Sequence, residues 1–507
     1  MVCEVGKETA AMRNGYLDGN YAPVQQEHTI TELAVTGTIP EHLDGRYLRN
    51  GPNPVTEIDP QTYHWFMGDG MVHGVRLRDG KAEWYRNRWI RSPAVAKALG
   101  EPAHHRRHRA GLEVLAANTN VLSHAGRTLA LVEGGVASYE LTDELNTVGP
   151  CDFDGSLRGG YTAHPKRDPD TGELHAISYF FGRGNTVQYS IIGVDGRARH
   201  TVDIPVTGSP MMHDFSLTQN HVVIYDLPVI FDPVQGAEII FPRALRTPLR
   251  LVLSALIGRV RVPDPITAMF GKCARGNANM PYSWDPTYPA RIGVLPRQGS
   301  AHDIRWFDVA PCYVFHPLNA YEEADTIVLD VVRHPKMFDN VDERTEHHGP
   351  NGGGPTLDRW TVDLTAGKVC ETRLDDRPQE FPRIDERLLG RPHRYGYAMQ
   401  AASGTAAIAV DAVLKHDLHR GHTTERRLGQ HKQPGEFVFI PNSSDAAEDD
   451  GVLMGFVYDA STNCSDLVLL DAETLENIAA IHLPDRVPHG FHGNWSPSAT
   501  ATPAPHQ

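Results

Sequence analysis

Apolar and polar residues alternate over short stretches along most of this 507-residue chain. The alternation has the period of a β-strand, and the stretches are rich in Val, Ile, Tyr, Phe and Thr, as in HVVIYDLPVIF (221–231) and GVLMGFVYD (451–459). Gly, Pro, Asp and Asn cluster between them, and Asp79-Gly80 marks a hairpin turn. Short strands spread over a whole long chain are typical of a β-barrel or a β-propeller. The units differ in length and show no clean repeat, so periodicity alone does not give a blade number.

One segment departs from the strand pattern, FPRALRTPLRLVLSALIGRVRVPDPITAMF at residues 241–270. It is apolar between Pro248 and Pro263. Four arginines surround the apolar part: Arg246, Arg250, Arg259 and Arg261. One interpretation is an amphipathic element, which makes peripheral contact with a membrane or guards an apolar entrance. The other is a helix that packs on the body with its arginines in water. The sequence leaves both interpretations open.

Composition narrows the class of protein. Acidic residues outnumber basic ones by 63 to 48, a formal charge of −15, which argues against nucleic acid as a partner. The six cysteines form no C-x-x-C pair, so neither a zinc knuckle nor a redox dithiol is expected, and their sparseness suits reduced cytosolic thiols. The chain shows no secretory signal and no run of about 18 apolar residues. We therefore expect a cytoplasmic protein.

The domain organisation is expected to be simple. No low-complexity linker divides the chain, so residues 16–495 are predicted to form a single domain. Residues 1–15 are predicted to be a flexible extension, and the tail SPSATATPAPHQ (496–507) is predicted to be disordered. The oligomeric state is left open.

Four histidines scattered along the chain carry the candidate chemistry. They lie in the segments YTAHPKRD, PMMHDFS, VFHPLNAYEE and GFHGNW, and are His164, His213, His316 and His492. Only a closed fold would bring them together, and any one of the 27 histidines is by itself more often structural than a ligand. All-imidazole ligation suits iron, copper or zinc. Zinc hydrolases more often use three protein ligands, whereas four neutral imidazoles around octahedral Fe(II) leave two positions for O₂.

Three glutamates stand in apolar or turn settings where a carboxylate needs hydrogen-bond partners: Glu133 in LALVEGG, Glu380 in QEFPRI and Glu436 in PGEFVFIPN. Histidines that bind a metal generally donate their other N–H to a carboxylate or a carbonyl. These glutamates are therefore candidates to orient the histidines. The alternative is that each is an exposed glutamate at a strand end.

With these segments in view, the chain resembles the carotenoid cleavage oxygenases. This family of non-haem iron enzymes includes carotenoid and apocarotenoid oxygenases, lignostilbene dioxygenases and the retinal-pigment-epithelium isomerohydrolase. The resemblance runs from about Tyr16 to Trp495. It rests on IPEHLDGRYLRNGPNP (39–54), HWFMGDGMVHGVRLRDGKAEWYRNRW, the histidine segments, EFPRI, AEDDG (447–451) and PHGFHGNW, all in the family's order. The likeness is strongest to the actinobacterial, mycobacterial-type members.

The resemblance implies an all-β fold, a seven-bladed β-propeller with a cap of helices and loops over the face that contains iron. It implies one Fe(II) per chain, bound by the four histidines, with Glu133, Glu380 and Glu436 as partners of three of them. Asp69, in GDG, matches a family motif but is expected to hold a turn. His489 is a local rival, because it precedes GFHG where relatives carry an apolar residue; His492 is preferred because it alone matches FHG.

The reaction that the resemblance implies is cleavage of a conjugated C=C bond of a carotenoid or apocarotenoid by O₂, giving two carbonyl products. Phe66, Trp89 and the stretch 249–257 are candidates to line an apolar substrate tunnel, with core packing as the alternative.

Three other functions compete with carotenoid cleavage as interpretations of this sequence. The stilbene-cleaving branch is similar but uses a lysine before the first glutamate and an earlier tyrosine; here Val132 and Trp89 occupy those places, which favours carotenoids. A non-catalytic propeller that binds apocarotenoid or a protein partner has no use for the four-histidine, three-glutamate set. The isomerohydrolase reaction is the least favoured, because nothing in the sequence indicates a retinyl ester.

Overall fold

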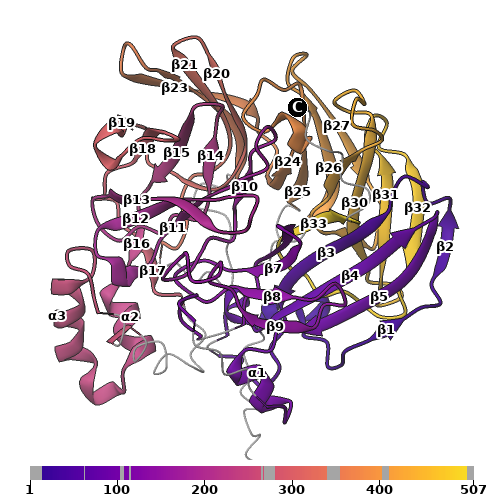
Figure 1. The fold of residues 1–507 in the computed structure, drawn as a ribbon, viewed down its shortest axis with the longest axis horizontal. Coiled ribbons are helices and arrows are strands. Elements are labelled where there is room, and N and C mark those ends of the chain that lie inside the picture. The colour runs from indigo at the N-terminus through magenta and orange to yellow at the C-terminus, as the bar shows by residue number, and fades with distance from the viewer. Residues whose placement is uncertain are drawn as a thin grey trace, which may run out of the picture.

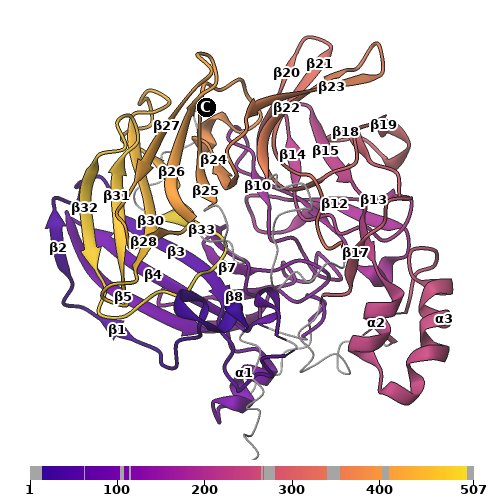
Figure 2. The same ribbon diagram turned by 180° about the vertical axis from the view of Figure 1, so that it is seen from behind.

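The computed structural model describes residues 14–61, 63–102, 108–113, 116–263, 266–267, 280–339, 354–401 and 410–498. Within these residues, seven antiparallel sheets of four to six strands surround a central axis as a seven-bladed β-propeller (Figure 1 and Figure 2). The expected fold is confirmed, and so is the blade number that the resemblance implied. An eighth, two-stranded sheet of β16 (Val229–Phe231) and β17 (Tyr282–Trp284) lies outside the blades.

The blades are numbered here in chain order, each from its inner strand outward. Blade 1 consists of β33 (Gly493–Pro497), β3 (Gly45–Pro52), β4 (Gly70–Arg78), β5 (Lys81–Trp89) and β1 (Thr29–Ile30). Blade 2 consists of β6 (Asn120–His124), β7 (Arg127–Leu131), β8 (Tyr139–Leu141) and β9 (Thr147–Pro150). Blade 3 consists of β10 (Lys166–Arg167), β11 (Leu174–Ser178), β12 (Thr186–Ile192) and β13 (Ala198–Pro205). Blade 4 consists of β14 (Phe215–Leu217), β15 (His221–Asp226), β18 (Arg291–Pro296) and β19 (Arg305–Asp308).

The remaining blades follow the same plan. Blade 5 consists of β20 (Tyr313–Glu323), β21 (Thr326–His334), β22 (Thr356–Asp363) and β23 (Lys368–Asp375). Blade 6 consists of β24 (Gln379–Arg383), β25 (Tyr395–Ala401), β26 (Val410–Asp417) and β27 (His422–Arg427). Blade 7 consists of β29 (Val438–Pro441) and β28 (Lys432–Pro434), which both pair with β30 (Gly451–Asp459), then β31 (Cys464–Asp471), β32 (Asn477–His482) and β2 (Ala34–Gly37).

Burial explains why the strand pattern varies along the chain. A strand in the middle of a blade is covered on both faces by neighbouring blades, so β30 is buried over all but its last residue. The outermost strands meet solvent on one side, and β13 accordingly alternates between buried or half-buried and exposed positions. The continuous apolar runs in the sequence are therefore central strands, and the clearest alternation belongs to edges.

Both ends of the described chain close the ring. The last strand, β33, pairs with β3 of blade 1 in the register Asn494 to Leu48, and the early strand β2 pairs with β32 of blade 7. Two contacts lie just outside the expected range of 16–495: Asn14 is buried and donates to the Tyr63 carbonyl at 2.8 Å, and β33 continues to Pro497. Residues 1–13 and 499–507, where an extension and a tail were expected, lie outside the described residues.

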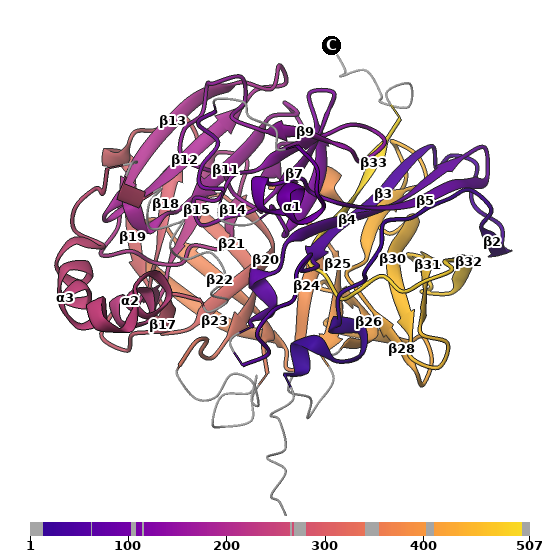
Figure 3. The same ribbon diagram turned by 90° about the horizontal axis from the view of Figure 1, so that it is seen from below.

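Helices are short and lie outside the blades. Among the residues that the structure describes, the α-helices with defined bounds are α1 (Pro93–Ala98), α2 (Pro233–Ile240) and α3 (Arg246–Leu256). The 3-10 helices are η1 (Gly15–Leu17), η2 (Gly19–Tyr21), η3 (Trp65–Met67), η4 (Phe181–Arg183), η5 (Arg243–Leu245), η6 (Ala301–Asp303) and η7 (Glu386–Leu388). Helices α2 and α3 pack on each other at one edge of the propeller (Figure 1 and Figure 3). No helix in the described part of the chain is long and apolar enough to cross a membrane.

Helix α3 falls within the segment 241–270 that the sequence singled out, and its apolar residues divide between two environments. Leu253 is buried, but Leu251 and Val252 are 66% and 47% exposed. A helix that simply packed on the body would bury such residues, so the packing interpretation accounts for only one side of α3. Residues 264–265 and 268–270 of this segment lie outside the described residues.

Candidate metal centre

The inner end of every blade contributes one candidate residue to a point on the propeller axis. The loop after β7 carries Glu133, and the residues just before β10, β14, β29 and β33 include His164, His213, Glu436 and His492. His316 lies in β20 and Glu380 in β24. In blade order from 2 to 7 and then 1, the seven residues are Glu133, His164, His213, His316, Glu380, Glu436 and His492. The sequence could identify these residues, but only the closed ring brings them together.

The four histidines form a compact group. One ring nitrogen from each lies within 4.8 Å of those of the others, and each of the four residues is at least nine-tenths buried. The Nε2 atoms of His213 and His316 are 3.2 Å apart. The separations suit a single ion held by several imidazoles at once.

Three of the histidines each contact one of the three glutamates. His213 Nδ1 lies 2.8 Å from Glu133, His316 Nδ1 lies 2.6 Å from Glu380, and His492 Nδ1 lies 3.0 Å from Glu436. An ionised carboxylate only accepts hydrogen bonds, so each Nδ1 carries the proton. Each Nε2 then holds a lone pair that is free to bind a metal, which is the arrangement found around metal-bound histidines.

His164 has different surroundings. Its Nδ1 is 3.8 Å from Asp214, too far for a hydrogen bond, and that carboxylate instead accepts from Lys166 Nζ at 2.8 Å. Its Nε2 is buried and has no hydrogen-bond partner in the described protein. A buried imidazole nitrogen without a partner costs free energy, and a metal ion on that nitrogen would offset this cost. The donor set therefore fits a metal.

The four histidines do not share one protonation behaviour: burial lowers the pKa of His164 and His316, whereas for His213 the Glu133 carboxylate outweighs burial and raises the pKa above its ordinary value. Burial, together with the neighbouring His213 and His492, holds the pKa of His164 well below its ordinary value, and burial lowers the pKa of His316 to about 4. For Glu436, burial opposes ionisation, but Arg383 and His492 outweigh it and lower its pKa to about 2. Neutral imidazoles beside ionised carboxylates are the forms that bind a divalent cation.

Irregular strand pairing helps to set the orientation of the His316 and Glu380 side chains. The β20–β21 ladder shifts register on either side of Pro317, next to His316, and the β24–β25 ladder shifts between Glu380 and Arg383. Phe381, inside the second shift, has a φ of +54°, a left-handed conformation that is rare for a residue with a side chain. This conformation places its N–H 2.8 Å from Glu380 Oε2 and stacks its ring on His316 at 5.6 Å.

The other candidates from the sequence lie elsewhere. His489 is not among the four clustered histidines: its Nε2 contacts the Gln433 side chain at 2.9 Å and its ring packs on Tyr21. Asp69 holds a turn, since its carbonyl and carboxylate accept from the N–H groups of Asn53 and Val55. Its expected structural role agrees with these contacts.

The two tunnel candidates differ from each other. Trp89 is 5% exposed, packs in the core between blades 1 and 2, and donates its indole N–H to the Asn53 carbonyl at 2.8 Å. These are the surroundings of a core residue. Phe66 is half-buried and meets Phe491, the neighbour of His492, at 5.4 Å between ring centroids. Of the two, Phe66 is the one adjacent to the histidine group.

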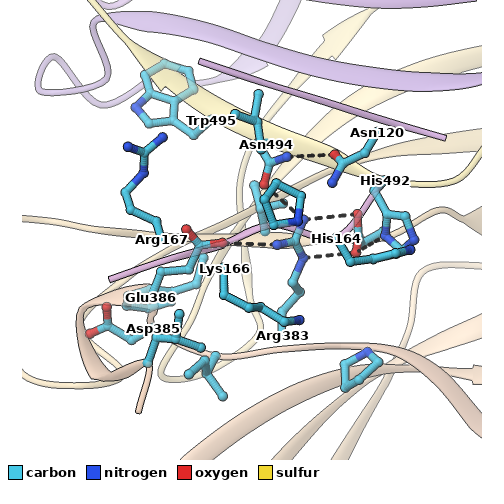
Figure 4. A pocket seen from close by; sticks show the side chains of 18 of the residues that line it. Asn120, His164, Lys166, Arg167, Arg383, Asp385, Glu386, His492, Asn494 and Trp495 are labelled. Carbon is cyan, nitrogen blue, oxygen red and sulfur yellow. Dashed lines mark hydrogen bonds and ion pairs between the residues drawn. The ribbon is translucent and has the colours of Figure 1, made fainter. Parts of the chain in front are cut away.

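A pocket of about 270 Å³ reaches three of the four histidines (Figure 4). His164, His316 and His492 form part of its wall. Its charged lining residues include Lys166, Arg167, Arg383, Asp385, Glu386 and Arg387. Arg383 spans the pocket from Glu386, at 3.0 Å, to Glu436, at 2.9 Å. Apolar side chains such as Leu318, Phe381 and Phe439 also line it, so charged and apolar groups share this pocket.

Sequence reasoning missed three contributors to this centre. Arg383 lies three residues after Glu380 in the EFPRI segment, and this proximity in the sequence could have identified it. Lys166 follows His164 by two residues. His334, which contacts the far side of Glu380, lies in VVRHP with nothing in the local pattern to mark it.

Comparison with known proteins gives consistent matches over nearly the whole chain. Residues 21–497 match the family described as retinal pigment epithelial membrane protein. The chain is 58% identical to a carotenoid cleavage oxygenase of Mycobacterium tuberculosis over 501 residues, which cover 97% of this chain and 99% of that protein.

Solved structures also match nearly the whole chain. The crystal structure of a Pseudomonas brassicacearum lignostilbene dioxygenase superposes with a TM-score of 0.78 at 26% identity, covering 95% of this chain and 98% of that one. Cobalt-substituted Synechocystis apocarotenoid oxygenase superposes with a TM-score of 0.76 at 28% identity, covering 94% of this chain and 97% of that one.

Proposed function

The chain belongs to the family of the retinal pigment epithelial membrane protein and the carotenoid cleavage oxygenases, and on that premise we propose that it uses O₂ to cleave a conjugated C=C bond of a carotenoid or apocarotenoid. The products would be two carbonyl compounds. The observation that carries the proposal is the group of four buried histidines, three of them hydrogen-bonded to glutamates. A scaffold would gain nothing from burying seven such residues on its axis.

We assign the four histidines as ligands of one Fe(II) per chain, with Glu133, Glu380 and Glu436 as the groups that orient three of them. Four neutral ligands leave the ion its full charge, and the bound iron would supply the activation of O₂. The chain's own residues keep the imidazoles deprotonated at Nε2, fix their orientation and shield them from bulk water. No acid or base acts on the alkene in this scheme.

The substrate class rests on two kinds of support. The relative at 58% identity is a carotenoid cleavage oxygenase, whereas the lignostilbene dioxygenase matches at 26%. In this chain Val132 is buried beside Glu133, and the Trp89 indole is already hydrogen-bonded to backbone, so neither is a group that would bind a phenolate. The test is incubation of the iron-loaded protein with carotenoids, apocarotenoids and hydroxystilbenes, with mass spectrometry of the products. Ready cleavage of hydroxystilbenes with intact carotenoids would overturn the assignment.

We also propose that the region around α3 rests on a membrane surface. Its exposed large apolar residues are Leu245, Leu251, Val252, Leu256, Val260 and Ile266. Arg243, Arg250, Arg259 and Arg261 are exposed among them, on a chain that is otherwise strongly acidic. Apolar side chains interleaved with arginines favour shallow insertion among lipid headgroups. A polyene substrate dissolves in lipid, so contact with a bilayer would give it a short path to the protein.

A further inference from the structure

Glu380 is held at both ends by imidazoles. Its Oε2 lies 2.6 Å from His316 Nδ1, and its Oε1 lies 2.6 Å from His334 Nε2. His334 ends strand β21 of blade 5, whereas Glu380 lies in β24 of blade 6, so the contact crosses between two blades. Both side chains are about nine-tenths buried, which excludes bulk water as a substitute partner.

The three glutamates of the centre do not have equivalent supports. Glu436 receives two hydrogen bonds from the Arg383 guanidinium, and Glu133 lies beside the Tyr179 hydroxyl. Glu380 alone receives its second side-chain hydrogen bond from another histidine. The centre therefore contains a histidine, glutamate and histidine chain on one of its sides, which ends in His316.

The direction of these hydrogen bonds follows from charge. Burial disfavours the ionised form of Glu380, but the two histidines outweigh it and hold its pKa far below the ordinary value. An ionised carboxylate only accepts, so the contacting nitrogens of His316 and His334 both carry protons. His316 is thereby fixed in the tautomer whose Nε2 faces the other histidines.

His334 has no other evident task. It is not one of the four clustered histidines, and its ring meets the edge of Phe315 at 5.1 Å. Without its N–H, the Glu380 Oε1 atom would be a buried carboxylate oxygen with no hydrogen-bond partner among the described residues, and the carboxylate would gain freedom to rotate away from His316. Packing alone would be satisfied by any ring of this size.

We propose that His334 is a positioning residue that holds Glu380 in the orientation in which it aligns His316 for the metal. The inference rests on the metal site of the proposed function, but it does not depend on which substrate that site serves. It predicts that the N–H donor at position 334 matters more than the volume of the side chain.

The test compares substitutions by the donor that they retain. In His334→Gln the amide nitrogen lies close to the place of Nε2, in His334→Asn it falls short of that place, and His334→Phe keeps the ring without a donor. Metal-free protein is titrated with Co(II), and both the affinity and the visible absorption bands are recorded. Thermal unfolding of each metal-free variant checks that it is folded. His175→Phe, at a buried histidine that contacts Tyr189 in blade 3, controls for the loss of any buried imidazole.

We expect His334→Gln to bind Co(II) within about threefold of the wild type and to keep its absorption bands. We expect His334→Phe to lose about ten- to a hundredfold in affinity and to shift the bands, and His175→Phe to do neither. If His334→Phe does not fold, a difference of the same sign between His334→Gln and His334→Asn supports the assignment. Equal affinities and spectra across the series, or equal losses in Gln and Phe, would overturn it. Wild-type protein that binds Co(II) but, loaded with iron, leaves polyenes intact would contradict the proposed function and not this inference.

Discussion

The Nε2 atoms of His213 and His316 lie 3.2 Å apart, although 103 positions separate the two residues in the chain. Each ring donates its Nδ1–H to a glutamate, so two lone pairs face each other across this distance. Such a pair is repulsive unless a cation lies between the nitrogens. The same condition holds for His164, whose buried Nε2 has no partner among the described residues. The group is therefore best understood as a metal site.

Removal of a proposed ligand should abolish metal binding. His164→Ala and His492→Ala each delete one of four imidazoles, and we expect no stoichiometric iron and no polyene cleavage in either variant. Metal analysis of the purified proteins measures the first effect directly.

His489→Ala is the matched control for that experiment. It removes a buried histidine three residues from His492, and loss of its contact with Gln433 should cost about 1–3 kcal/mol of stability. Iron content should stay at one per chain. Loss of iron in His489→Ala alone, with retention in His492→Ala, would reverse the ligand assignment.

Glu436→Gln should weaken metal retention by about ten- to a hundredfold. The amide is neutral, so Arg383 would keep only Glu386 as a charged partner and His492 would lose the carboxylate that orients it. The rate of iron loss to a chelator measures the effect. Glu425→Gln, at an exposed position on the outer strand β27, is the control and should lose iron at the wild-type rate. Equal rates for all three proteins would exclude the role assigned to Glu436.

The hydrogen bonds of Glu322 predict that the free energy of unfolding depends on pH. Burial opposes its ionisation, but hydrogen bonds from His221, Thr218 and Asn220 outweigh it and lower its pKa from 4.5 to about 2. Because the folded pKa lies below the unfolded value, the stabilisation is complete above about pH 5 and is lost as the pH falls through 4.5 toward 2. The Glu322 side chain is partly exposed, so solvent screening reduces the effect to about 1 kcal/mol.

Denaturant unfolding of the wild type and Glu322→Gln at a series of pH values checks this. The stability difference should be largest near neutral pH and should shrink between pH 5 and pH 3. A difference that is constant over this range would show that the carboxylate charge contributes nothing to the contact between β20 and the turn before β15.

Leu251→Glu should weaken membrane binding. Leu251 is 66% exposed on α3, and burial of such a side chain in lipid contributes about 2 kcal/mol, so the charge should reduce binding roughly tenfold or more. Sedimentation with vesicles of phosphatidylcholine and phosphatidylglycerol measures it. Val194→Glu, at a residue 63% exposed in the turn between β12 and β13, is the matched control and should bind like the wild type. Wild-type protein that stays in the supernatant would contradict the proposed contact.

Local sequence chemistry was sufficient for the strands. It singled out four candidate histidines, but only the family resemblance separated them from structural histidines. The residues next to His492 and Glu380, in GFHGNW and EFPRI, mark turns and ladder irregularities that the structure places beside the site. The blade number came only from the resemblance, because blades of unequal length leave no repeat to count. Helix α2 was missed, since its eight residues are too few to show a helical period.

The partnerships within the site could not be predicted from local patterns. Glu133 of blade 2 pairs with His213 of blade 4 and not with His164 of the adjacent blade 3. His334 reaches Glu380 across a blade boundary, and its surroundings in the sequence resemble any strand end. Such contacts depend on the closure of the ring, which a pattern of two or four residues does not encode.

Cleavage of a polyene by the iron-loaded protein under ¹⁸O₂ tests the central claim most directly. The protein is loaded with Fe(II) without oxygen, mixed with a carotenoid or apocarotenoid, exposed to ¹⁸O₂, and its products are identified by mass spectrometry at short times. We predict two carbonyl products from one C=C bond, each labelled with ¹⁸O, and none from His164→Ala. Protein that holds one iron per chain yet consumes no O₂ and leaves every polyene intact would contradict the account.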